Sequence, residues 1–119
     1  MSGLVAIAIR GGADLGAHVD PHFGRADSFL LVEASGGNGV QVLRNAAAQG
    51  EHGAGVGAAA LMVRHGVGAV VAGRFGPKAY DALRAAGIAM HVASEDMTAG
   101  QALERLRAGT LERYEVKTY

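Results

Sequence analysis

The segment 20–26, Asp-Pro-His-Phe-Gly-Arg-Ala, gathers an imidazole, an aromatic ring and a guanidinium where neither a helix nor a strand can run. Its Asp-Pro pair favours a turn, and Gly24 frees the backbone just after His22 and Phe23. Ligand-binding side chains on a glycine-punctuated loop indicate a site, because loops on a rigid scaffold often carry function. The same residues also suit a plug at the end of a hydrophobic core, since pockets and core edges share this composition.

Glycine-lined helix starts are predicted at residues 53–57 and 76–78. The first N–H groups of a helix are unpaired, and its N-terminus is the positive end of the helix dipole, so such starts attract anions. Basic side chains occur near these places and near the end of the first apolar run: Arg10, Arg25, Arg74 and Lys78. The sequence therefore predicts a locally positive crevice with an anionic ligand. The alternative is that the glycines only allow close packing and the basic groups are solvated.

Two histidines are candidate metal ligands, His22 on the segment 20–26 and His52 on a glycine-bracketed loop before a predicted helix. His18 and His22 have the i, i+4 spacing of a helical metal pair, but the surrounding glycines and proline disfavour a helix. His65 is expected to stabilise the end of a helix, and His91 is expected to pack within a strand or face solvent.

The composition limits the function classes. The chain has eleven basic and eleven acidic residues, and this balance argues against a nucleic-acid partner, which would favour a basic excess. It has no cysteine, which excludes disulfides and thiolate-held zinc or iron–sulfur centres. A metal would therefore be bound by histidine, carboxylate or methionine, or would arrive with its own sulfide.

No apolar run approaches the roughly 20 residues that a membrane span requires, and no basic leader precedes the first strand, so we expect a cytoplasmic protein.

The order of elements predicts one α/β domain over residues 1–119. Strands are expected at residues 4–9, 28–33, 40–44 (an edge strand), 69–73 and 88–92, and helices at residues 55–66, 77–86 and 99–108. The last helix should begin with a Thr98–Gln101 capping box. The tail 110–119 is polar enough to fray, although Leu111, Tyr114 and Val116 could dock it. The first helix has a predicted apolar face of Val56, Ala59, Ala60 and Val63.

Three successive strands followed by alternating helices and strands predict a three-layer α/β/α sandwich around a mixed five-stranded sheet. If strands 4–9 and 69–73 are central, ligands should bind beyond their carboxyl ends. Residues 10–12 and 73–76 follow those two ends, and the loop with His22 begins at the same edge.

Patterns typical of enzymes are weak here. Gly53-x-Gly55-x-x-Ala58 loosely matches a dinucleotide fingerprint, but no acidic residue follows about 20 positions later. No phosphate-binding P-loop, no spaced carboxylate set and no nucleophile–base pair stands out, so we expect binding rather than catalysis.

Three motifs in order resemble the dinitrogenase iron–molybdenum cofactor biosynthesis family, which includes NifX-like carriers and the C-terminal region of NifB-like proteins. The motifs are residues 22–26, residues 50–55 (Gly-Glu-His-Gly-Ala-Gly) and residues 73–79, and the resemblance runs from Val5 to about Leu106. It implies a ribonuclease H-like fold whose second strand is antiparallel to the rest. It also implies noncovalent binding of metal–sulfide clusters or their precursors. The small, cysteine-free form further resembles the orange-protein group of sulfate reducers, which implies a molybdenum–copper sulfide cluster.

By position, His22 matches the His-Phe-Gly motif of the family and His52 its His-Gly loop. We therefore hypothesise a carrier or assembly scaffold for an anionic metal–sulfide cluster, of molybdenum–copper or iron–molybdenum type, with client or assembly proteins as partners. The expected lining is Arg10, Gly11, Gly12, His22, Phe23, Arg25, His52, Gly53, Gly55, Arg74, Phe75, Gly76 and Lys78, with His22 and His52 as metal ligands. The alternatives are a metal-free regulatory module that docks a partner protein, and a small ribonuclease H-like hydrolase.

Overall fold

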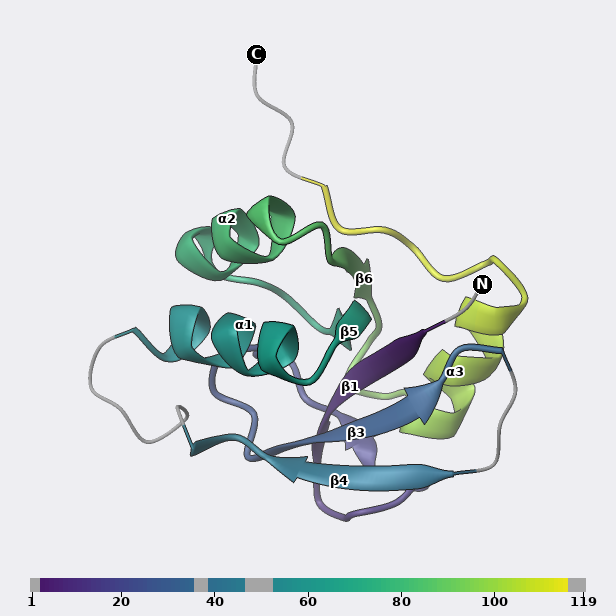
Figure 1. Ribbon diagram of the computed structural model, residues 1–119. Coiled ribbons are helices and arrows are strands. Elements are labelled where there is room, and N and C mark those ends of the chain that lie inside the picture. Colours follow the sequence, from purple (N-terminus) through teal and green to yellow (C-terminus); the bar gives the residue numbers. More distant parts are fainter. Residues whose placement is uncertain (1–2, 36–38, 47–52, 116–119) are drawn as a thin grey trace.

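The computed structural model describes residues 3–35, 39–46 and 53–115 (Figure 1). Along the chain, the elements are β1 (Leu4–Arg10), β2 (His18–Val19), β3 (Ser28–Glu33), β4 (Val40–Arg44), α1 (Ala54–Arg64), β5 (Val67–Ala72), α2 (Pro77–Ala85), β6 (Ala89–Val92) and α3 (Ala99–Arg107). None of the helices in these ranges is long and apolar enough to cross a membrane.

The sheet is mixed, with the strand order β4-β3-β1-β5-β6. Strands β1, β5 and β6 are parallel, whereas β3 is antiparallel to both of its neighbours, β1 and β4. The predicted central pair, edge strand and antiparallel strand are therefore confirmed, and the arrangement is compatible with a ribonuclease H-like fold.

The predicted number of strands was wrong, because the described residues form a sheet of six strands and not five. The additional strand is β2, which pairs antiparallel with the end of β1, with Val19 opposite Ile9. Val19 is buried, so the loop folds back to cover an apolar side chain. A strand of two residues has no periodicity that a sequence pattern could reveal.

The helices form the outer layers of the sandwich. Helices α1 and α2 pack side by side on one face of the sheet, and α3 covers the other face (Figure 1). Alternation along β1 separates two cores, since Ala6 and Ala8 face α1 and α2 while Ile7 and Ile9 face α3. These two cores support a sheet edge on which the loops after β1, β5 and β6 meet.

The predicted apolar face of α1 was wrong in part. Val56 and Val63 are 44% and 55% exposed, and Ala60 is exposed as well, so only Ala59 of the predicted face is buried. The buried residues of α1 are Ala54, Ala58, Ala59 and Met62. A Cβ on Gly55 would lie only 3.0 Å from the Cβ of Ala79 in α2. The two helices thus approach through small residues, and this close packing turns the larger valines towards solvent.

The described part of the tail docks onto the domain. The Val92 N–H donates to the Glu112 carbonyl at 2.9 Å, and the Tyr114 N–H donates to the Met90 carbonyl at 2.9 Å. Leu111 is buried. Residues 112–114 therefore lie along β6, with Arg113 opposite His91 in an isolated antiparallel bridge, and Val116 lies outside the described residues.

His91 in β6 lies beneath this docked segment. It is 8% exposed, and its ring Nδ1 has no hydrogen-bond partner among the described residues. Burial lowers the pKa of His91 below its usual 6.5, and the charge of Arg113 acts in the same direction. The Leu111 and Glu112 backbone, which accepts hydrogen bonding from the ring, opposes this shift of the pKa without cancelling it. The folded protein therefore favours the neutral imidazole.

This shift predicts a loss of stability in acid. The unfolded chain binds a proton at His91 more readily than the folded chain. The stabilisation is therefore complete above pH 6.5 and falls as the pH drops towards the lowered pKa. The expected slope from this one group is at most about 1.4 kcal/mol per pH unit. Urea denaturation of the wild type and His91→Gln, on both sides of pH 6.5, checks it. An equally steep acid loss in the variant would contradict the assignment.

Candidate functional site

A pocket with a volume of about 440 Å³ lies where the loop after β5 meets the starts of α1 and α2, and we name it the His22 pocket. Its lining comes from segments that are far apart in the sequence. The lining residues are His22, Phe23, Gly24, Arg25, Gly53, Ala54, Gly55, Val56, Arg74, Phe75, Gly76, Pro77, Lys78 and Ala79.

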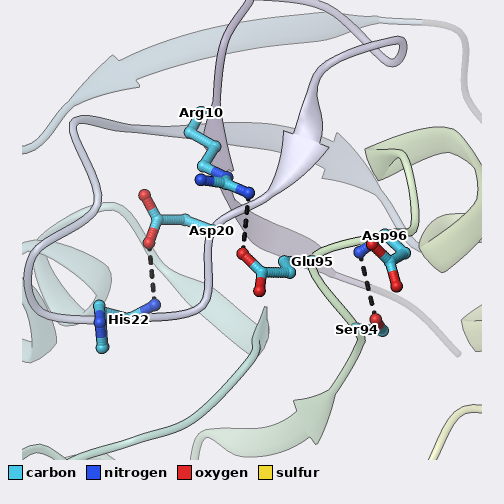
Figure 2. A network of polar contacts seen from close by, with 6 residues as sticks. All are labelled: Arg10, Asp20, His22, Ser94, Glu95 and Asp96. Atoms are coloured by element: carbon cyan, nitrogen blue, oxygen red, sulfur yellow. Dashed lines mark hydrogen bonds and ion pairs between the residues drawn. The ribbon is translucent and has the colours of Figure 1, made fainter.

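Backbone hydrogen bonds fasten the loop with His22 to the ends of two central strands. The Asp20 N–H donates to the Ala8 carbonyl of β1 at 2.8 Å, and the Gly73 N–H donates to the Asp20 carbonyl at 3.0 Å. The His22 N–H donates to Asp20 Oδ1 at 2.8 Å, a turn that an Asp two residues upstream favours (Figure 2). Asp20 thus positions the loop without lining the pocket.

Glycines allow two backbone segments to approach each other closely at this edge. A Cβ on Gly24 would lie 2.9 Å from the Cα of Gly55, and a Cβ on Gly73 would lie 2.6 Å from the Cα of Pro21. Side chains at either position would separate the segments. Gly24 and Gly73 therefore serve close packing, as the alternative interpretation of the glycines expects. The closely packed segments also form the wall of the pocket.

The N-termini of α1 and α2 both open into the His22 pocket. Their N-cap residues are Gly53 and Gly76, and no side chain among the described residues caps either helix. Neither helix has an acidic residue in its first turn. By contrast, α3 begins with the predicted Thr98–Gln101 capping box, which is confirmed. The first-turn N–H groups of α1, and those of α2 after Pro77, are therefore available to a ligand, and both helix dipoles favour a negative one.

Three basic side chains from different segments line the pocket: Arg25, Arg74 and Lys78. Neither Arg74 nor Lys78 forms an ion pair with another residue that the structure describes. Arg74 instead lies against His22, with its Nε–H donating to the ring Nδ1 at 2.9 Å. The pocket therefore combines positive charge, amide donors and one imidazole.

Aromatic rings form the base of the pocket. Phe23 is 1% exposed, and its ring centroid lies 5.4 Å from that of Phe29 and 5.2 Å from that of Phe75. The Tyr114 hydroxyl donates to the Phe75 carbonyl at 3.1 Å. The two explanations of segment 20–26 thus apply to different residues, because Phe23 fills the core and half-buried His22 lines the pocket.

Some predicted site residues lie elsewhere. Arg10 forms an ion pair with Glu95, 2.8 Å away (Figure 2). It is not among the residues that line the His22 pocket. Gly11 is exposed with a φ of 74°, and Gly12 packs against Ala17. His52 lies outside the described residues. In the described ranges, no three His, Cys, Asp or Glu side chains cluster as a metal site.

Several lining residues were absent from the predicted set: Gly24, Ala54, Val56, Pro77 and Ala79. Most belong to the first turns of α1 and α2. The sequence signal for them was the pair of predicted helix starts, since a helix that begins at a pocket presents its whole first turn there.

The chain is similar to known proteins over nearly its whole length. A family model described as dinitrogenase iron-molybdenum cofactor matches residues 3–109. An uncharacterized protein of Methanocaldococcus jannaschii is 32% identical over 99 residues, which cover 82% of this chain and 83% of that protein.

Two solved structures are similar to this chain in both fold and sequence. The apo form of the orange protein from Desulfovibrio gigas has a TM-score of 0.88 and 35% identity, covering 96% of this chain and 94% of that one. A Thermotoga protein with a proposed NifB assignment has a TM-score of 0.80 and 31% identity, covering 98% of this chain and 97% of that one.

Proposed function

This chain belongs to the dinitrogenase iron–molybdenum cofactor family, and on that premise we propose that it is a noncovalent carrier or assembly scaffold for an anionic metal–sulfide cluster. The cluster is cargo, so no catalytic step is part of the proposal. That client or assembly proteins are its partners, and that it is located in the cytoplasm, stay predictions.

One observation carries the proposal: the N-termini of α1 and α2, which no described side chain caps, converge on one pocket with three basic side chains. No acidic side chain occurs among the described lining residues. Thiometallates are polyanions that bring their own sulfur, so the host requires N–H donors and cations rather than thiolates. The chemistry of the donors in the His22 pocket fits such a cargo.

We propose a molybdenum–copper sulfide as the cargo in preference to an iron–molybdenum type. The similarity to the orange protein supports this choice. The imidazole of His22 also supports it, because imidazole nitrogen is a good ligand for copper. His22 would bind the metal, and Arg25, Arg74, Lys78 and the two helix N-termini would bind the sulfide anion. His52 stays a predicted second ligand.

Reconstitution tests the proposal. Adding tetrathiomolybdate and Cu(I) to the metal-free protein is expected to produce a visible charge-transfer band, with molybdenum and copper co-eluting with the protein on desalting. Lys78→Met should weaken retention about fivefold at low salt and reduce its salt dependence, because one cation is lost from the pocket. His22→Ala should alter the spectrum.

Arg64→Met is the matched control, since it removes one exposed cation from the end of α1, outside the pocket. A silent spectrum, or equal weakening by Arg64→Met, would contradict the proposal. Elemental analysis of protein isolated from its native host would distinguish the carrier from a metal-free docking module.

A further inference from the structure

His22 and Arg74 are held side by side by the backbone. They form an isolated parallel bridge, and the Phe23 N–H donates to the Arg74 carbonyl at 3.2 Å. Their side chains meet at both ring nitrogens, with Arg74 Nε 2.9 Å from Nδ1 and Arg74 Nη2 3.1 Å from Nε2. The backbone therefore fixes the positions of the Cα atoms of His22 and Arg74. The Arg74 side chain is exposed, so its guanidinium can rotate away from the imidazole.

This contact occupies the part of His22 that a metal needs. A guanidinium has only N–H donors, so the ring Nδ1 must accept with its lone pair, and the proton of the neutral ring is on Nε2. A neutral imidazole has one such lone pair, and a metal ion binds through it. If the metal bound Nε2 instead, the proton would move to Nδ1 and face the Arg74 N–H. Neutral His22 therefore cannot keep the hydrogen bond from Arg74 Nε at Nδ1 and also bind a metal through either nitrogen, so metal binding competes with this contact.

An anion offers Arg74 a better partner. Hydrogen bonds from a guanidinium to an anion are charge-assisted and about twice as strong as neutral ones. Arg74 has no acidic partner among the described residues, and it lines the pocket into which the N-termini of α1 and α2 open. An anion in the His22 pocket would thus draw the guanidinium off the imidazole.

We propose that Arg74 sets the order of loading, with a thiometallate anion bound first and a soft metal ion bound second at His22. The proposal rests on the proposed function, because it assumes that anion and metal share this pocket. By linkage, each ligand strengthens the binding of the other by the same factor. Arg74 is therefore a positioning residue, which guards His22 in the metal-free protein and contacts the anion in the loaded one.

The test measures Cu(I) affinity against a competing chelator, with and without excess molybdate. Molybdate is the anion probe because its hard oxygens bind Cu(I) poorly, so it cannot carry copper into the pocket itself. In the wild type, molybdate should tighten Cu(I) binding about tenfold, the equivalent of one charge-assisted hydrogen bond. Arg74→Met should bind Cu(I) alone about tenfold more tightly, and molybdate should then add less than about twofold.

Two further variants separate lone-pair competition from simple charge repulsion. Lys78→Met removes a cation from the same pocket without touching His22, and it should raise Cu(I) affinity by less than about threefold. Adding His22→Ala to Arg74→Met should abolish the gain, because the freed imidazole is its source.

The outcomes also separate this proposal from the proposed function. Unchanged Cu(I) affinity in Arg74→Met, or a gain that survives His22→Ala, would overturn the loading order even if thiomolybdate and copper still assemble in the wild type. Absence of any effect of molybdate on Cu(I) binding in the wild type would overturn it too. A His22-dependent gain in Arg74→Met, combined with failed thiomolybdate reconstitution, would support the role of Arg74 and contradict the proposed cargo.

Discussion

Phe23→Ala is expected to lower the free energy of unfolding by about 4 kcal/mol. The Phe23 side chain is fully buried, and its ring contacts those of Phe29 and Phe75. Truncation would leave a cavity between the sheet and the loop with His22, since β3 and the loop after β5 hold the two neighbouring rings in place. Native domains are stable by only about 5–15 kcal/mol, so the variant would lose a large share of its stability. Urea denaturation measures the loss.

Two controls accompany this variant. Phe23→Leu keeps most of the buried volume and should lose less than half as much stability. Val63→Ala removes apolar atoms from an exposed position on α1, and it should change stability by less than about 0.5 kcal/mol. A loss of less than about 1.5 kcal/mol in Phe23→Ala would contradict the core role that its burial indicates.

Gly73→Ala is expected to lower the free energy of unfolding by about 3 kcal/mol and to weaken anion binding in the His22 pocket. The new Cβ would lie 2.6 Å from the Cα and 2.8 Å from the carbonyl oxygen of Pro21. Both are backbone atoms, so the loop would have to move away from the end of β5. That movement would separate His22 from Arg74, which the two segments now hold together. Urea denaturation and thiomolybdate titration measure the two effects.

Gly39→Ala is the matched control for this substitution. Its Cβ would meet no atom of the described residues within 4 Å, and the φ of Gly39 lies outside the positive range that favours glycine. It should therefore change stability by less than about 0.5 kcal/mol. Equal stability of Gly73→Ala and Gly39→Ala would show that the loop tolerates the displacement and is not held as the backbone contacts indicate.

The stability and the site of this protein depend on the same residues. The base of the His22 pocket continues as a series of ring contacts through Phe75 to Tyr114, with centroids 5.1 Å apart in that last pair. Tyr114 belongs to the segment that docks along β6. A substitution in this series should thus affect both unfolding and ligand retention, which is why matched controls are necessary.

Local signals in the sequence were sufficient to predict the positions of most strands and helices. The continuous apolar runs of β1 and β3, the proline at the start of α2 and the Thr98–Gln101 capping box each involve residues within one turn or one strand. Such signals act between neighbours in the chain, so they can be read without knowing the fold. The family motifs, which run in order along the chain, similarly indicated the family.

What the sequence by itself determined was the order of the strands and helices other than β2, the positions where α2 and α3 begin, and a supply of glycines and cations near those starts. The tertiary structure alone decided that Arg74 meets His22, 52 residues away, that Arg10 pairs with Glu95, and that Val56 and Val63 face solvent. These outcomes depend on how closely two distant backbone segments approach. That distance is set by packing against other segments and leaves no periodic trace in either one.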